Sequence, residues 1–72
     1  MDIAHLVKMA NEIGAFFESE PDSAEGSRAV ANHLRRYWEP RMRKAIVAHA
    51  SAGGTGLSEI AKQAVLQLES PQ

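Results

Sequence analysis

RRYWEPRMRK, residues 35–44, contains the Glu39-Pro40 pair that decides how this chain folds. Proline has no backbone N–H to donate, and inside a helix its ring clashes with the carbonyl four residues earlier, at a cost of about 3 kcal/mol. At the first position of a helix, proline costs almost nothing. We therefore predict that one helix ends before Pro40, that another begins at Pro40, and that the two meet at a corner.

This corner divides the stretch into residues with different expected orientations. Three large side chains fall on the apolar sides of the two helices and are predicted to point inward: Tyr37, Trp38 and Met42. Four cations are predicted to point outward: Arg35, Arg36, Arg41 and Arg43. Glu39 lies four residues from both Arg35 and Arg43, so local ion pairs account for part of the cluster, at about 0.3–0.5 kcal/mol each.

Hydrophobic periodicity predicts four helices, over residues 3–18, 23–38, 40–50 and about 59–68. Side-chain oxygens are available as N-caps before three of them: Asp2, Asp22 with Glu25 as a capping box, and Ser58. No strand pattern is present. We predict an all-α fold, a small compact bundle of three or four helices with a Pro corner between helices 2 and 3. Residues 1–72 should form a single domain with a frayed tail at 69–72.

Glycines and phenylalanines suggest how the helices pack. Gly14 costs roughly 1 kcal/mol inside a helix relative to Ala, and two explanations remain open: the close approach of another backbone, or an ordinary small core residue. Phe16 beside Phe17 widens the apolar surface of the first helix beyond what one neighbour needs, so this helix is expected to pack on two sides. The SAGGTG segment, residues 51–56, should end the third helix with left-handed glycines.

The composition excludes several classes of chemistry. The chain of 72 residues has no cysteine, so it has no disulfide, thiolate metal site, iron-sulfur ligand or thiol nucleophile. A domain of this size is often stabilised by a partner. The formal net charge is −1, yet six of eight Lys and Arg residues lie between Arg28 and Lys44. The N-terminal segment has no basic n-region and is interrupted by polar residues, which predicts a cytoplasmic protein without a membrane span.

No residue pattern indicates catalysis or metal binding. His5, His33 and His49 fall on separate predicted helices without helical i, i+3 or i, i+4 partners, so they are expected to be half-buried and satisfied by backbone or solvent. The serines lie at helix ends or in turns, where capping explains them. The GGTG sequence at 53–56 lacks the Lys and the preceding strand of a phosphate-binding loop. We therefore expect no enzymatic activity and no catalytic, cofactor-binding or metal residues.

Two binding functions remain for the basic cluster. A small helical nucleic-acid-binding module would use the arginines on phosphates, but the net charge is negative and Glu39 interrupts the run; salt-dependent binding to duplex DNA tests this alternative. Arg, Trp and Tyr are also the residues that concentrate binding energy in protein interfaces. We favour a protein interface and predict its contact residues to be Arg35, Arg36, Trp38, Glu39, Pro40, Arg41 and Arg43.

Three segments, MANEIGAFF (9–17), ANHLRRYWEPRMR (31–43) and GGTGLS (53–58), closely resemble the delta subunit of the soluble NAD-dependent formate dehydrogenases. This small subunit accompanies a molybdenum or tungsten catalytic subunit. The similarity extends over nearly the whole chain, and the central motif is specific. Glu59 stands where family members can have Pro, a difference that concerns only the start of a helix.

The resemblance implies a non-catalytic accessory subunit that binds the large catalytic subunit and supports assembly, stability or cofactor loading. Partner subunits are then expected to carry the molybdopterin cofactor, iron-sulfur clusters, flavin and NAD, with no cofactor in this chain and no nucleic-acid or membrane partner. Two alternatives stay open: a transient maturation factor for the same enzyme, and self-association of the isolated chain. Whether the arginines meet the partner protein or an anionic cofactor is also open.

Overall fold

A computed structural model describes residues 2–69 and consists of four helices: α1 (Ile3–Phe17), α2 (Ser23–Tyr37), α3 (Pro40–Ser51) and α4 (Glu59–Gln67). No strand occurs within these residues. The predicted all-α bundle with a corner at Pro40 is therefore confirmed, and the predicted helix ends agree within one residue. Of the predicted frayed tail, Glu69 lies in a turn, and residues 70–72 lie outside the described part of the chain.

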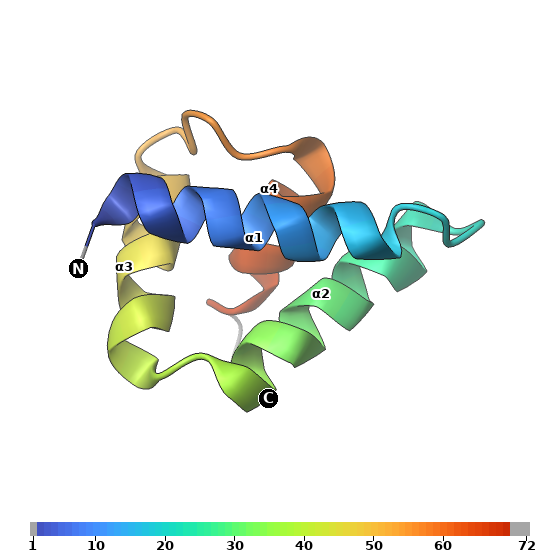
Figure 1. Ribbon diagram of the computed structural model, residues 1–72, viewed down its shortest axis with the longest axis horizontal. Helices are drawn as coiled ribbons and strands as arrows, with labels where there is room; N and C mark the ends of the chain where they lie inside the picture. Colours follow the sequence, from blue (N-terminus) through green and yellow to red (C-terminus); the bar gives the residue numbers. More distant parts are fainter. Residues whose placement is uncertain (1, 70–72) are drawn as a thin grey trace.

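Helices α1 and α4 are the centre of the arrangement. Each of them contacts the other three helices. Figure 1 shows α2 and α3 diverging from the Pro corner, with α1 lying across both of them and α4 behind it. The corner therefore connects two helices that are held apart by α1 and α4, and its geometry depends on the whole bundle.

Side-chain caps begin three of the helices as predicted. The Asp2 carboxylate accepts the Ala4 N–H at 3.0 Å, the Asp22 carboxylate accepts the Ala24 N–H at 2.9 Å, and the Ser58 hydroxyl accepts the Ala61 N–H at 3.4 Å. Glu25 does not complete the predicted capping box. Its carboxylate instead accepts from Arg28, one turn along α2, at 2.7 Å.

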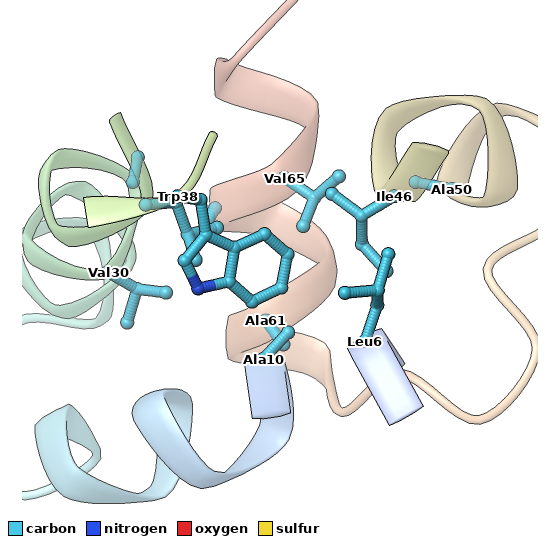
Figure 2. Packing of buried hydrophobic residues seen from close by; sticks show 11 residues of the cluster. Leu6, Ala10, Val30, Trp38, Ile46, Ala50, Ala61 and Val65 are labelled. Atoms are coloured by element: carbon cyan, nitrogen blue, oxygen red, sulfur yellow. The ribbon is translucent and has the colours of Figure 1, made fainter. Parts of the chain in front are cut away.

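Trp38 is the largest side chain of the core, which all four helices and the corner supply. The buried apolar residues are Leu6, Ala10, Val30, Ala31, Leu34, Trp38, Ile46, Ala50, Ala61, Ala64 and Val65. Figure 2 shows the indole of Trp38 directed toward the middle of this cluster, near Ala10 and Ala61. Met42 is half-buried against the same cluster, so the inward predictions for Trp38 and Met42 are confirmed.

The prediction that Tyr37 points inward is wrong, because 68% of its surface is exposed. It is the last residue of α2, and Trp38 has extended backbone angles, φ −88° and ψ 140°. This change of backbone directs Trp38 into the core while Tyr37 stays on the helix surface. There the Tyr37 ring packs against His33, one turn earlier, with ring centroids 4.7 Å apart.

Gly14 lies where α1 crosses α4. A Cβ atom at this position would lie 2.8 Å from Cγ2 of Ile60 and 3.6 Å from the Ala61 nitrogen. The close approach of another helix, one of the two explanations left open by the sequence, is therefore the reason for the glycine. Although α1 contacts several neighbours, Phe16 is not covered by any of them and is 78% exposed.

The loop between α3 and α4 is fixed at both of its ends. Gly54 has φ 69° and donates its N–H to the His49 carbonyl at 2.9 Å, which confirms the predicted glycine-dependent end of α3. Farther along, the Asn11 side chain donates to the Gly56 carbonyl at 2.8 Å and accepts from the Ser58 N–H at 2.8 Å. Asn11 thus attaches the loop to α1 just before α4 begins, a contact that connects two of the motifs noted above.

Candidate partner-binding surface

The corner begins with the buried Trp38 and continues through two exposed residues, Glu39 and Pro40. Glu39 has extended backbone angles, φ −67° and ψ 152°, and precedes α3 without making a side-chain cap. Pro40 occupies the start of α3, where its missing N–H costs nothing. Trp38 therefore anchors the corner from inside while the residues that follow it are presented to solvent.

Arg43 supports the corner from α3. Its guanidinium donates to the Arg35 carbonyl at 3.2 Å and to the Trp38 carbonyl at 2.5 Å. The last carbonyls of a helix have no donor within that helix, so Arg43 supplies donors to the end of α2. Arg43 is half-buried. The prediction that it points outward is wrong, because backbone carbonyls across the corner offer it partners.

Arg35 has a similar role at the end of another helix. Its guanidinium donates to the Gln67 carbonyl at the end of α4, at 2.9 Å, and to the Asn32 side chain at 3.3 Å. The Gln67 side chain in turn donates to the buried hydroxyl of Ser27 at 3.0 Å. Arg35 is also half-buried, so the prediction that it points outward is wrong. As for Arg43, backbone carbonyls offer it partners, and here the contact joins α2 to α4.

The predicted ion pairs of Glu39 with Arg35 and Arg43 do not form. Within residues 2–69, the carboxylate of Glu39 has only Arg41 within 4.0 Å, and their side chains are 71% and 81% exposed. A pair so open to water contributes little stability. Because Arg35 and Arg43 bind carbonyl oxygens instead, the local charge pattern is a poor guide to their contacts.

Arg36, Tyr37, Glu39, Pro40 and Arg41 are all exposed and form the surface that we call the outer corner. Arg36 has no carboxylate within 4.0 Å among the residues that the structure describes. The predicted site residues therefore separate into two groups. Trp38, Arg35 and Arg43 hold the corner in place, while Arg36, Glu39, Pro40 and Arg41 face outward. Tyr37, which the sequence reasoning placed in the core, joins the outward group.

Replacing Arg43 with methionine should lower the free energy of unfolding by about 1–3 kcal/mol, because it leaves carbonyls at the end of α2 without donors. Arg41→Met is the matched control, since Arg41 is exposed and its removal should change stability by no more than about 0.5 kcal/mol. Urea denaturation followed by circular dichroism measures both values. Equal stabilities of the two variants would contradict the capping role of Arg43.

The surface grooves of residues 2–69 include three that lie along the helices. One lies between α2 and α4 beside Glu18, Glu20 and Glu59. A second lies beside the corner between α3 and Leu68. The third lies between α1 and α2 and is mainly apolar. Within residues 2–69, no group of three His, Cys, Asp or Glu side chains is positioned for a metal ion.

The histidines lie in separate environments. His49 is half-buried, and its Nε2 lies 2.7 Å from the Thr55 carbonyl, which confirms the expected backbone partner. His33 packs on Tyr37, whereas His5 is exposed, contrary to the half-buried prediction. Over the described residues, none of the helices combines the length and apolar content that crossing a bilayer requires. Exposed charged and aromatic side chains, including those of the outer corner, are available for binding a partner.

Comparison with known families identifies a match for most of the chain. A family model described as NADH-dependent formate dehydrogenase delta subunit FdsD matches residues 5–65. This span contains α2, α3 and the corner completely, together with most of α1 and α4. No curated protein and no solved structure matches this chain.

Proposed function

Because the chain belongs to the FdsD family of NADH-dependent formate dehydrogenase delta subunits, we propose that it is a non-catalytic accessory subunit that binds the catalytic subunit of such a complex. Binding would support assembly, stability or cofactor loading. Other subunits of the complex, which we place in the cytoplasm, would carry the molybdopterin cofactor, iron-sulfur clusters, flavin and NAD. The absence of cysteine from this chain leaves it no thiolate for an iron-sulfur cluster.

The family match carries this proposal, and the outer corner supplies its physical basis. Arg36 and Arg41 present guanidinium groups that are exposed and only weakly paired, and a guanidinium binds a carboxylate through two parallel hydrogen bonds. Tyr37 beside them offers an exposed ring that buries a large area with few rotatable bonds. We therefore propose that the outer corner contacts carboxylates or carbonyls of the partner, while Trp38, Arg35 and Arg43 keep its shape.

Reversing both exposed charges, Arg36→Glu with Arg41→Glu, should reduce recovery of the chain with a tagged catalytic subunit about tenfold or more. Breaking a charge pair at the centre of an interface typically costs 2–5 kcal/mol. The helical circular dichroism of the free chain should stay nearly unchanged, because both side chains project into solvent. The measurement is quantitative recovery after coexpression, with the dichroism recorded on the same variant.

Lys8→Glu with Arg28→Glu is the matched control. It changes the net charge by the same amount at two exposed positions outside the corner. Recovery of the control should match that of the unaltered chain. Full recovery of the Arg36/Arg41 variant would remove the outer corner from the interface, and an equal loss in both variants would indicate a general charge effect rather than a local contact.

A further inference from the structure

The groove between α1 and α2 has an exposed phenylalanine on its wall. Its lining residues are Met9, Glu12, Ile13, Phe16, Phe17 and His33. Phe16 is 78% exposed, yet its ring is packed edge-to-face on Phe17, with centroids 5.1 Å apart and an interplanar angle of 86°. Figure 1 shows that α1 and α2 diverge from the turn that joins them.

This groove is continuous with the outer corner. His33 lines the groove and packs on Tyr37, one helical turn farther along α2. Tyr37 belongs to the outer corner and is 68% exposed. Phe16 and Tyr37 are therefore connected through His33 into one surface. They are also the two most exposed large hydrophobic residues among those that the structure describes. Exposed apolar surface of this kind commonly marks a binding site.

The two helices that form the groove carry opposite charges near it. Glu12 belongs to the α1 wall, and Arg36 lies three residues after His33 on α2, which is the spacing of neighbours on a helix surface. Within residues 2–69, neither Glu12 nor Arg36 has an oppositely charged side chain within 4.0 Å. An occupant of complementary charge would therefore have an acidic flank beside Arg36, a basic flank beside Glu12 and an apolar stripe between them.

We propose that this groove binds an amphipathic helix of the catalytic subunit, an inference that rests on the proposed function. Apolar residues of that helix, at three-and-four spacing, cover Phe16 and Tyr37, and an acidic residue pairs with Arg36. The shape of the groove favours a helix over a second copy of this chain. A single helix presents a convex ridge that enters the space between two diverging helices, whereas a second copy in a two-fold symmetric dimer would oppose this groove with an identical groove.

Photo-crosslinking tests the occupant directly. The chain is made with p-benzoylphenylalanine in place of Phe16, coexpressed with the subunits of the formate dehydrogenase and irradiated in the intact complex. We expect a crosslink to a segment of the catalytic subunit that has apolar residues at three-and-four spacing and an acidic residue beside them. The same probe in place of Gln63, an exposed residue of α4, is the control and should not label that segment.

Phe16→Ser with Tyr37→Ser provides a second test that does not depend on the probe. Both side chains are largely exposed, so the free chain should keep its helical circular dichroism. Recovery with the catalytic subunit should fall about tenfold or more, as for loss of aromatic anchors at the centre of an interface. A matched control is Lys8→Ser with Glu18→Ser, two exposed positions of α1 and its end outside this groove.

The outcomes separate this inference from the proposed function. A crosslink from position 16 to a second copy of this chain, or to a segment without helical apolar spacing, would overturn the assignment of the groove. Full recovery of the Phe16/Tyr37 variant would do the same and leave the accessory-subunit proposal intact. Failure of the unaltered chain to co-purify with the catalytic subunit would overturn both.

Discussion

Replacing Trp38 with alanine should lower the free energy of unfolding by about 3–5 kcal/mol, the range observed when a buried tryptophan is truncated. Trp38 is 5% exposed and lies in the core near the small side chains of Ala10 and Ala61, so its truncation would leave a cavity there. A core of this size supplies only about 3–5 kcal/mol of net stability. The variant should therefore be largely unfolded, as measured by its circular dichroism and urea denaturation.

The adjacent residue supplies the control for this prediction. Tyr37→Ala removes an aromatic side chain that is 68% exposed, so stability should change by only about 0.5 kcal/mol. The comparison isolates the direction of the two side chains, because both positions lie at the same end of α2. Similar destabilisation in the two variants would contradict the opposite orientations of Tyr37 and Trp38.

Replacing Gly14 with valine should lower the free energy of unfolding by about 1–3 kcal/mol, the usual cost of extra carbon atoms in a packed core. A Cβ atom alone would lie 2.8 Å from the Cγ2 atom of Ile60. That atom is attached to a β-branched carbon with little rotational freedom, so relief requires α1 and α4 to move apart. Thermal and urea denaturation both measure the effect.

Two further variants establish that the cost arises at the helix crossing. Ala15→Val introduces the same side chain at the next, exposed position and should change stability by about 0.5 kcal/mol. Ile60→Ala removes the obstructing group, so Gly14→Val should cost less in that background, with a coupling energy of about 0.5–3 kcal/mol. Additive effects of Gly14→Val and Ile60→Ala would contradict a direct clash.

The elements of the fold depend on local chemistry and were predictable from the sequence. Pro40 cannot continue a helix, and Asp2, Asp22 and Ser58 can each accept an N–H at a helix start, so the four helices and the corner follow from neighbouring residues. The reason for Gly14 stayed open because it depends on Ile60, on another helix.

The orientations at the corner were less predictable, because they depend on groups distant in the sequence. Arg35 binds the Gln67 carbonyl, and Arg43 binds carbonyls at the end of α2. From the sequence, both arginines were predicted to point outward, with Glu39 as a possible local ion-pair partner, and helix-end carbonyls were not considered as their partners. Asn11 was not identified for the same reason, since its partners lie in the loop before α4.

The sequence therefore identified the corner as a segment, and the structure changes which of its residues are exposed to a possible partner. Tyr37 is exposed, and not buried as predicted, because the helix ends between it and Trp38. Apolar periodicity does not show which of two adjacent aromatic residues at a helix end points inward. Arg35 and Arg43 were predicted to contact the partner, and their side chains instead hold the corner in place. The contribution of Phe16 emerged only from the groove that α1 and α2 form together, which requires their packing geometry.

The stoichiometry of the native complex tests most directly whether this chain is an accessory subunit of the formate dehydrogenase. The chain, tagged in its native host, is purified, and the proteins that accompany it are identified and quantified by mass spectrometry. We predict that a formate dehydrogenase catalytic subunit co-purifies in a fixed ratio that persists in the active, cofactor-loaded enzyme. Recovery of this chain only with catalytic subunit that lacks its cofactor would instead indicate a transient maturation factor. Absence of the catalytic subunit from the purified material would contradict the accessory-subunit proposal.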